Sequence, residues 1–409
     1  MHWKIDTNLT IVVIGLGYVG LPTALAFSKK YKTIGIDTNL EKVNNLKREH
    51  HGISFGSIIP KINGRKVFIV TVPTPVEENK EPDLSHLIDA SRSIGMALRK
   101  GDLVIYESTT FPGCTEDVCI PELASESKLK LNKDFGVGYS PERINPGSGN
   151  SIEDIVRVTS GSNNEITDFV DDLYQSILIV RTYKTSSIRI AEASKLVENC
   201  QRDVNISYVN ELALIFDKMG LSTQEVLEAA KTKWNFMDFK PGLVGGHCIS
   251  VDPYYLIHSS KKLGYYPQVI GAGRAVNDEM GKYVAHKCMK LMAAKRIPLQ
   301  GAKVLILGFA YKANCDDFRN TKSIDIYEEL KDFGLHVQIT DSHVNPSKFK
   351  EKFGFELVQN FNVNEFDLII HAVAHGSYQE LYREIDPERK RIVFDATNTW
   401  PIPFCDGYL

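Results

Sequence analysis

The sequence predicts an α/β protein: two Rossmann-like doubly wound domains, joined by a long central helix and a helical middle domain. Short apolar runs alternate with helical patterns in the first part of the chain, and the same alternation restarts near residue 300. Between these parts, residues 188–219 carry a helical pattern that no glycine or proline interrupts. We therefore expect three domains, at residues 1–187, 188–298 and 299–409.

The composition is that of an ordinary globular protein. Of 409 residues, 43% are hydrophobic, and 48 Lys and Arg stand against 51 Asp and Glu, which gives a net charge of −3. This balance gives no support for nucleic acid or an anionic membrane as a partner. No stretch approaches the ~20 apolar residues of a membrane span, and no apolar segment typical of a signal peptide precedes the first predicted strand.

The seven cysteines are scattered and odd in number, and they lack any C-x-x-C pairing. The pattern predicts neither a disulfide framework nor a metal site. We therefore expect a cytoplasmic protein with reduced thiols.

The first predicted strand, residues 9–14, runs directly into a glycine-rich turn and then a helix at residues 21–30. The turn reads Gly-x-Gly-x-x-Gly, in which the first glycine permits the tight bend, the second lets a pyrophosphate approach, and the third allows close helix packing. A phosphate then lies against the helix N-terminus. The dinucleotide-binding residues expected in this turn are Gly15, Gly17, Tyr18, Val19 and Gly20.

The second predicted strand, residues 33–36, ends at Asp37. A carboxylate at this point can accept hydrogen bonds from ribose hydroxyls and repels a 2′-phosphate, which favours NAD over NADP. Lys42 weakens this preference, because a nearby cation could meet a phosphate. As an alternative, Asp37 serves only as a turn or capping residue.

Further strands alternate with helices up to about residue 185. The predicted strands are 66–71, 103–106, 135–139, 155–158 and 177–180, with a helix at 84–100. Ligands of such sheets bind outside the carboxyl ends of the strands. The segments expected to surround one crevice there are the glycine turn, residues 72–75, Ser108, Thr109 and Glu142.

The middle region is predicted to be helical at residues 188–219, which Gly220 ends, at 221–231 and at about 269–293. Such a helical spine suggests a dimer interface. Lys195 and Asn199 are four residues apart, so they share one helix face. A solvated face is the ordinary explanation of that pair.

The stretch Gly245-Gly246-His247-Cys248, followed by Asp252 and Pro253, is the least ordinary part of this region. Glycines allow a sharp turn and the close approach of another molecule, and a thiol on such a turn can act as a nucleophile. A packed thiol is the alternative, because free cysteines are usually buried.

The last part reads as a second, smaller nucleotide-binding-like domain. It has predicted strands at 302–307, 335–340, 366–371 and 391–394 and a helix at 321–333, but only one glycine after its first strand. It therefore need not bind a dinucleotide. In the loop 311–319, Lys312 and Arg319 stand where a ligand phosphate would lie, unless the loop is simply solvated.

An NAD-binding domain and a reactive thiol together suggest an oxidation that passes through the aldehyde level. Sulfur adds to the carbonyl, the hemithioacetal loses hydride, and the thioester is hydrolysed. A simple alcohol dehydrogenase would leave the thiol unused.

The sequence resembles the UDP-glucose/GDP-mannose dehydrogenase family over essentially its whole length. The matching motifs lie at residues 13–22, 72–75, 107–110, 140–143, 193–199 and 245–253, followed by Phe-Ala-Tyr-Lys and Asp-Phe-Arg-Asn-Thr-Lys. The stretch from Ala230 to Cys248, with Asp-Pro-Tyr-Tyr-Leu after it, resembles the branch that acts on UDP-N-acetylhexosamines in capsule and O-antigen synthesis.

The resemblance implies a role for each matching residue. Cys248 would be the nucleophile, Lys195 and Asn199 would act at the C6 oxygen or a water, and Glu142, Asp252 and Thr109 would serve thioester hydrolysis. The implied NAD contacts are Gly15, Gly17, Tyr18, Val19, Gly20, Asp37, Lys42, Thr74, Ser108, Thr109 and Arg319. The implied substrate contacts, some of them reaching across from a second subunit, are Glu142, Arg143, Lys195, Asn199, Lys240, Gly245, Arg274 and Lys312.

The resemblance also implies a homodimer or higher homo-oligomer and a UDP-N-acetylhexosamine substrate, with UDP-N-acetylglucosamine preferred. UDP-N-acetylgalactosamine, UDP-glucose and UDP-N-acetylmannosamine are the alternatives. A single-step sugar-nucleotide oxidoreductase or epimerase, and an inactive NAD-binding regulator, are the alternatives of a different class. Residues 394–400 lack an arginine that many relatives carry, so no substrate contact is expected there.

Overall fold

The structure is a computed structural model that describes residue 5, residues 9–143 and residues 151–409. The chain forms two compact units. The first comprises Met1–Glu198 with Tyr254–Tyr265, and the second comprises Asn199–Pro253 with Tyr266–Leu409. Each unit contains one sheet and its own core. The finer division predicted at residues 187 and 298 stays a prediction.

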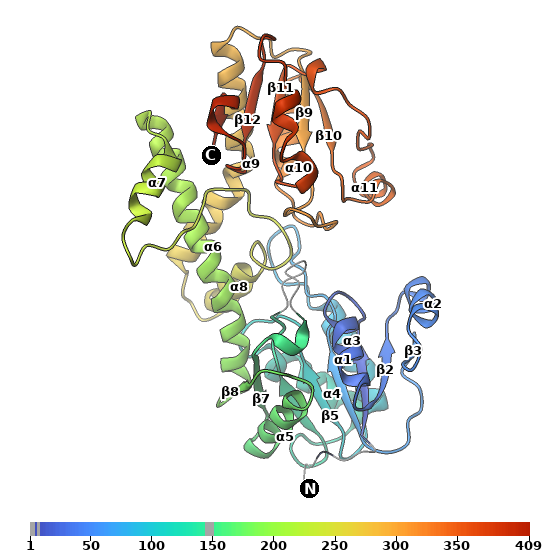
Figure 1. Ribbon diagram of the computed structural model, residues 1–409. Coiled ribbons are helices and arrows are strands. Elements are labelled where there is room, and N and C mark those ends of the chain that lie inside the picture. Colours follow the sequence, from blue (N-terminus) through green and yellow to red (C-terminus); the bar gives the residue numbers. More distant parts are fainter. Residues whose placement is uncertain (1–4, 6–8, 144–150) are drawn as a thin grey trace. The chain divides into compact units, whose positions relative to one another are not determined.

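The first unit contains an eight-stranded sheet in the order β3-β2-β1-β4-β5-β6-β7-β8 (Figure 1). Its strands are β1 (Thr10–Ile14), β2 (Lys32–Ile36), β3 (Ser54–Gly56), β4 (Lys66–Val70), β5 (Leu103–Tyr106), β6 (Gly136–Tyr139), β7 (Arg157–Gly161) and β8 (Thr182–Lys184). Neighbouring strands are parallel, except that β7 runs antiparallel to β6. The doubly wound prediction did not include this reversal.

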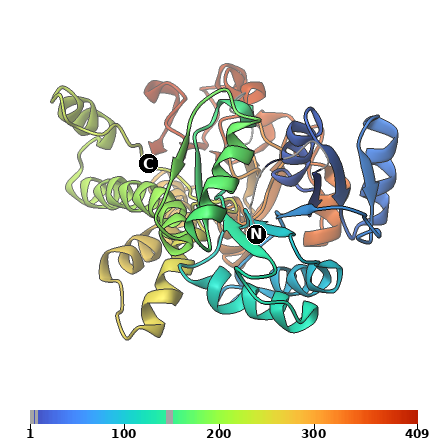
Figure 2. The same ribbon diagram turned by 90° about the horizontal axis from the view of Figure 1, so that it is seen from below.

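The helices of this unit are α1 (Gly20–Ser28), α2 (Leu40–Glu49), α3 (Ser85–Ala97), α4 (Ile120–Ser127) and α5 (Asn164–Gln175). The central strands are buried along their whole length and, apart from Thr10 and Lys66 at the starts of β1 and β4, are apolar, as expected for parallel strands covered on both faces. At one edge, the blue α2 packs beside the short strand β3 (Figures 1 and 2).

Two strand predictions at the far edge were wrong in position. The run 177–180 is not a strand; Ile177 and Leu178 follow α5 and pack into the core, and the strand β8 forms further on, at residues 182–184. The strand expected at 155–158 begins at Arg157 instead. Apolar runs report burial, and burial alone does not distinguish a strand from a packed turn.

The predicted uninterrupted helix is confirmed as α6 (Ile188–Met219), the long green helix of Figures 1 and 2. It is followed by α7 (Thr223–Lys231), α8 (Asp252–Lys262) and α9 (Gln268–Ala294). The sequence analysis missed α8. Its first two residues are Asp252 and Pro253, an acidic residue and a proline in the first turn, which is a helix-start signal.

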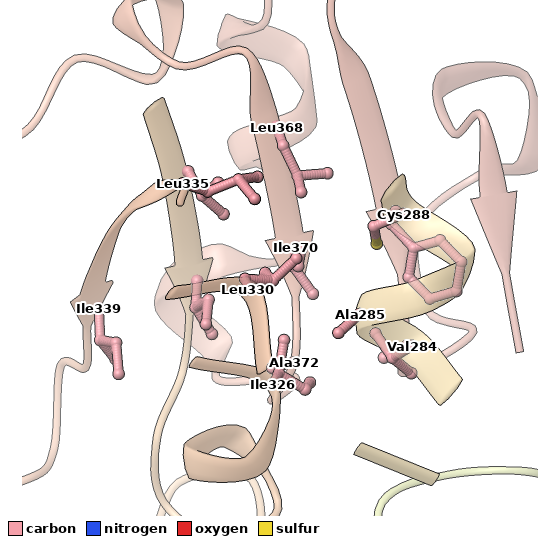
Figure 3. Packing of buried hydrophobic residues seen from close by; sticks show 14 of the residues in the cluster. Val284, Ala285, Cys288, Ile326, Leu330, Leu335, Ile339, Leu368, Ile370 and Ala372 are labelled. Atoms are coloured by element: carbon pink, nitrogen blue, oxygen red, sulfur yellow. The ribbon is translucent and has the colours of Figure 1, made fainter. Parts of the chain in front are cut away.

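The second unit contains an all-parallel sheet in the order β10-β9-β11-β12-β13, as the second Rossmann-like prediction requires. Its remaining elements are β9 (Lys303–Leu307), α10 (Ser323–Asp332), β10 (His336–Thr340), α11 (Pro346–Phe353), β11 (Leu368–His371), β12 (Ile392–Asp395) and β13 (Gly407–Tyr408). Side chains of α9, α10 and β11 interdigitate in its core, among them Val284, Ile326 and Ile370 (Figure 3).

No described helix combines the length and the apolar character that a bilayer crossing requires.

Candidate functional site

The glycine turn after β1 leaves space for a ligand. Gly15 has φ +90°, and a Cβ there would lie 3.0 Å from the backbone oxygen of Thr71. The Thr71 hydroxyl donates to the Gly15 oxygen at 2.7 Å, a contact that the sequence analysis missed. A Cβ on Gly20 would lie 1.8 Å from the same Gly15 oxygen, whereas a Cβ on Gly17 would meet nothing within 4 Å. The turn therefore packs against backbone atoms at Gly15 and Gly20 and leaves open space at Gly17, as a binding site for a pyrophosphate requires.

Asp37 holds the end of β2 against this turn. Its carboxylate accepts the Leu16 N–H at 2.9 Å and the Asn39 N–H at 2.9 Å, and it pairs with the Lys42 ammonium at 2.8 Å. Burial raises the pKa of Asp37, but Lys42 and the two N–H groups outweigh this effect, so the pKa is lowered. Asp37 is thus an anion at neutral pH, placed to accept hydrogen bonds from a ribose.

The loops after β4 and β5 lie side by side at the same edge of the sheet. The Thr74 hydroxyl donates to the Thr109 oxygen at 2.8 Å, and the Ser108 hydroxyl donates to the Val72 oxygen at 2.8 Å. Tyr255, from the part of α8 that belongs to this unit, donates its hydroxyl to the Thr74 oxygen at 2.9 Å. The sequence analysis did not single out Tyr255.

Glu142 and Arg143 follow β6 at this edge. Glu142 is buried. Arg143 is half-buried, pairs with Glu198 at 2.6 Å and donates to the Val156 oxygen at 3.0 Å. Lys195, on α6, is also buried. The first unit therefore gathers the glycine turn and the segments at 72–75, 107–110 and 140–143 at one edge of the sheet.

In the second unit, the Cys248 turn is held against the loop that follows β9. Gly246 has φ +89°, its N–H donates to the Arg319 oxygen at 3.0 Å, and its own oxygen accepts the Asn320 side chain at 2.8 Å. A Cβ on Gly245 would lie 2.8 Å from the Asn320 oxygen, and one on Gly246 would lie 2.8 Å from the Tyr311 ring. Both glycines are needed because the loop packs directly on them.

Cys248 is partly exposed on this turn. Its backbone oxygen accepts the N–H groups of Val251 at 3.0 Å and of Asp252 at 2.8 Å, which leads the chain into α8. The buried Asp252 carboxylate accepts the Asn199 side-chain amide at 2.5 Å. The structure therefore brings together Asn199 and Asp252, which are 53 residues apart.

Arg319, a predicted NAD contact, lies beside the Cys248 turn. Its guanidinium pairs with Asp317 at 2.5 Å and lies 3.1 Å from Nδ1 of His247. Burial raises the pKa of Asp317, but Arg319 outweighs burial, so the pKa is lowered. Asp317 and His247 had no predicted role. Asp317 stands two residues before Arg319. Their opposite charges at this short spacing could have suggested the ion pair.

The other predicted substrate residues of this unit differ in exposure. Lys240 is exposed, and Lys312 is half-buried with its ammonium 5.6 Å from the Tyr311 ring centroid. Arg274 is 2% exposed and pairs with Asp203 at 2.6 Å and Asp278 at 2.5 Å. The Arg274 guanidinium therefore pairs with carboxylates inside the unit, whereas Lys240, which is predicted to bind the same UDP-sugar, is exposed.

One group with metal-ligand chemistry occurs among the described residues. Ligand atoms of Asp341, His343 and His375 lie within 4.8 Å of one another. Nδ1 of His375 accepts the Asn314 N–H at 2.9 Å, and Nε2 lies 3.0 Å from the Asp341 carboxylate. Both ring nitrogens of His375 are therefore used within the protein, and the group acts as a hydrogen-bonded anchor.

Three parts of the chain match models of one family. Residues 9–55 and 52–178 match the NAD binding domain of the UDP-glucose/GDP-mannose dehydrogenase family, residues 189–279 match its central domain, and residues 305–401 match its UDP binding domain.

Relatives with high sequence identity agree with this match. The chain is 47% identical to the UDP-N-acetyl-D-glucosamine 6-dehydrogenase of Pseudomonas aeruginosa, over 92% of this chain and 93% of that protein. It is 46% identical to the Salmonella typhi protein of the same name, over 92% of each chain, and 45% identical to Protein CapL of Staphylococcus aureus, over 91% of each.

A solved UDP-D-ManNAc dehydrogenase from Pyrococcus horikoshii has 28% identity and a TM-score of 0.86, over 96% of each chain. The fold is thus shared over nearly the whole length of the chain. The chain belongs to the UDP-glucose/GDP-mannose dehydrogenase family, and it is an NAD-dependent oxidoreductase of UDP-sugars.

Proposed function

We propose that the protein is a UDP-N-acetylglucosamine 6-dehydrogenase that oxidises the C6 hydroxyl to the carboxylate. The observation that carries the proposal is the partly exposed Cys248 on a double-glycine turn, together with Asp252, which follows in the sequence and accepts a hydrogen bond from Asn199. Relatives of that name at 46–47% identity support the choice of sugar. The overall change is R–CH2OH + 2 NAD⁺ + H2O → R–COO⁻ + 2 NADH + 3 H⁺.

NAD would be held by Gly15, Gly17, Gly20, Asp37, Thr74 and Ser108, with further contacts from Tyr18, Val19, Lys42, Thr109 and Arg319. When bound there, it supplies the hydride acceptor for each oxidation. The open space at Gly17 and the anionic Asp37 fit its pyrophosphate and ribose.

In the alcohol step, Lys195 and Asn199 would act at the C6 oxygen. They stand one turn apart on α6, so both can address one small group. A lysine ammonium near the oxygen stabilises negative charge as the hydroxyl loses its proton. Asn199 is oriented by its hydrogen bond to Asp252.

In the second step, the Cys248 sulfur would add to the aldehyde carbon, and the resulting hemithioacetal would lose hydride to become a thioester. Water then adds to the acyl carbon, the carbon–sulfur bond breaks, and the thiolate recovers a proton. Glu142 would accept the proton of that water, Thr109 would help to hold it, and Asp252 would return a proton to sulfur.

The UDP-sugar would be bound by Arg143, Lys240, Gly245 and Lys312, together with the catalytic residues Glu142, Lys195 and Asn199. Arg274 would contribute through its ion pairs with Asp203 and Asp278. The match of residues 305–401 to a UDP binding domain supports a UDP ligand.

We propose a homodimer or higher homo-oligomer that acts in the cytoplasm and feeds a polysaccharide pathway. Tyr208, Ile215 and Met219 are exposed on α6 at spacings of seven and four, so they form one apolar stripe. The seven cysteines are free thiols, which suits a reducing compartment. The similarity to Protein CapL supports the pathway.

The test is NADH and uronate production with a panel of UDP-sugars. We expect two NADH per UDP-N-acetylglucosamine consumed, and lower turnover with UDP-N-acetylgalactosamine, UDP-glucose and UDP-N-acetylmannosamine. A ratio of one would indicate a single-step oxidoreductase, and no net NADH would indicate an epimerase or an inactive regulator. Cys248→Ala should bind NAD and sugar yet yield no uronate, whereas Cys405→Ala, at another partly exposed thiol, should behave as wild type.

A further inference from the structure

A buried carboxylate of α6 holds the segment that follows Thr109. Glu192 lies near the start of α6 and is 0% exposed. Its Oε1 accepts the Thr115 N–H at 2.9 Å and the Thr110 hydroxyl at 3.2 Å, and its Oε2 accepts the Gly113 N–H at 2.6 Å. These donors are 77 to 82 residues away in the sequence. One side chain, which had no predicted role, therefore fixes two distant segments of the first unit against each other.

The segment binds a carboxylate because it opens a helix. The N–H groups at the start of the helical segment Thr115–Cys119 have no acceptor within that segment. Gly113 has φ +97°, and a Cβ there would lie 2.8 Å from the Asp117 carboxylate, so this backbone requires glycine. Hydrogen bonds from N–H groups to a carboxylate are about twice as strong as those between neutral groups. Burial raises the pKa of Glu192, and the hydrogen bonds from the segment oppose that rise.

Thr109 is held from both sides. It is partly exposed, whereas the residues before and after it, Ser108 and Thr110, are buried. On one side the Ser108 hydroxyl donates to the Val72 oxygen at 2.8 Å, and on the other the Thr110 hydroxyl donates to Glu192. Thr109 is thus the exposed residue of a segment whose flanking hydroxyls are anchored in the protein.

The same part of α6 presents Lys195. Glu192 and Lys195 are three residues apart, so they share one face of the helix, and Lys195 is also buried. α6 therefore carries the lysine proposed for the alcohol step and, one turn earlier, the carboxylate that fixes the segment of Thr109.

We propose that Glu192 is a positioning residue for thioester hydrolysis, which holds Thr109 in a fixed place relative to Lys195. The inference rests on the proposed function, because it concerns the step in which water attacks the Cys248 thioester. In that step the water oxygen bonds to the acyl carbon, a water proton passes to Glu142, the carbon–sulfur bond breaks, and the thiolate takes up a proton. Because Glu192 is fully buried, it contacts neither the water nor the substrate.

The test is a single turnover, in which enzyme in excess of UDP-N-acetylglucosamine is mixed with saturating NAD. Stopped-flow absorbance of NADH reports the two oxidations. Acid quenching and intact mass report the decay of the Cys248 acyl-enzyme, which is the hydrolysis step.

Glu192→Gln replaces one acceptor oxygen by an NH2 group that faces the donors of the segment, so Thr109 should shift. We expect acyl-enzyme decay to slow by about ten- to a hundredfold, while the rate of NADH formation stays unchanged. A side chain that only stabilised the fold would slow both rates together.

The matched control is Arg189, which joins α6 to the same segment from the surface. Its guanidinium pairs with Glu116 at 2.5 Å and with Asp117 at 2.9 Å, and its side chain is 55% exposed. Exposed ion pairs contribute little, so Arg189→Met should leave both rates unchanged.

Equal slowing of the two rates in Glu192→Gln, an unchanged decay, or the same slowing of decay in Arg189→Met would overturn the inference. If Glu192→Gln does not fold, Thr110 gives a second test, because Thr110→Val removes its hydroxyl and Thr110→Ser keeps it. Decay should be slower in Thr110→Val, and equal decay in these two variants is enough to overturn the inference. A wild-type enzyme that forms no Cys248 acyl-enzyme would instead refute the proposed function.

Discussion

In each sheet one aspartate holds the loop that follows the first strand, Asp37 in the first sheet and Asp341 in the second, but the surroundings of the two aspartates differ. Each aspartate directly follows the strand that pairs with the first strand of its sheet, β2 beside β1 and β10 beside β9. Each accepts backbone N–H groups from the loop after that first strand, from Leu16 in one case and from Phe309 and Ala310 in the other.

The remaining partners differ. Asp37 is completed by Lys42, whose side chain is 40% exposed, and a Cβ on Gly17 would meet nothing within 4 Å. Asp341 is completed by the fully buried His375 and by the N–H groups of His343 and Val344. The loop after β9 is itself filled by buried side chains, Phe309 and Ala310.

The difference shows that the same arrangement of strand, loop and aspartate can either leave room for a ligand or anchor another loop. In the first sheet the loop and its carboxylate keep an open side, which a dinucleotide can occupy. In the second sheet protein atoms fill that side, and the anchor instead fixes the loop 311–319 through the hydrogen bond from Asn314 to His375. That loop packs on the glycines of the Cys248 turn. We call the arrangement around Asp341, which protein atoms fill, the closed copy, and the arrangement around Asp37 the open copy. The closed copy therefore supports the turn that carries the proposed nucleophile, Cys248.

The largest expected effect is a loss of protein stability when Asp341, in the closed copy, is replaced. Asp341→Asn leaves several buried donors facing a weaker acceptor and removes the charge opposite His375. We expect the free energy of unfolding to fall by about 3–5 kcal/mol, as measured by urea denaturation. Asp37→Asn should cost less than about 1 kcal/mol in the same assay, because its surroundings are more exposed. Equal losses at the two positions would contradict the comparison.

The stability difference at Asp341 should depend on pH. Burial raises its pKa, but the hydrogen bonds from His375, Phe309 and Ala310 outweigh burial and hold the pKa well below its usual range. A lowered folded-state pKa stabilises the protein above the unfolded value, about 3.9, and this stabilisation is lost as pH falls through the folded value. The gap in unfolding free energy between wild type and Asp341→Asn should therefore be largest near neutral pH and narrow below about pH 4. A gap that widens on acidification would refute the assignment.

The open copy is tested at Gly17. Gly17→Ala adds a methyl group into open space, so the thermal midpoint should not change, yet NAD should bind at least about tenfold more weakly, a loss of about 1.4 kcal/mol. Isothermal titration measures the affinity.

The matched change in the second sheet is Gly308→Ala, whose Cβ would lie 2.4 Å from that of Val373. It should lower stability and leave NAD affinity unchanged. A Gly17→Ala protein that binds NAD normally would show that this open side is not the pyrophosphate cradle.

Much of this arrangement could be predicted from the sequence, because it depends on local patterns. The glycine turn, Asp37 at the end of a strand, and the uninterrupted helix of Lys195 and Asn199 are set by residues close together in the chain. The motif around Cys248 is equally local, since Gly245, Gly246 and Cys248 lie within one run of four residues.

The rest depends on pairings between distant segments. The hydrogen bond between Asn199 and Asp252 joins two helices, and no spacing rule predicts it. The antiparallel direction of β7, which places Arg157 at the edge of the sheet where the parallel strands end, is set by the pairing with β6. The residues of β7 themselves do not predict this direction. Asp341 directly follows the strand predicted at 335–340, but its closing partner His375 lies 34 residues later.

The smallest effect should appear at Asp37 itself. Asp37→Ala removes the acceptor expected for the ribose hydroxyls and releases Lys42, with which it now pairs at 2.8 Å. NAD affinity should fall about tenfold, or about 1.4 kcal/mol, while UDP-sugar affinity stays the same. NADP should improve relative to NAD, because the anion that repels a 2′-phosphate is lost and a cation remains nearby. Titrations of both dinucleotides and of the UDP-sugar measure the three effects, with Asp89→Ala, an aspartate on α3, as the control. Equal weakening of NAD and UDP-sugar would mean that Asp37 serves only as a turn anchor, as Asp341 does.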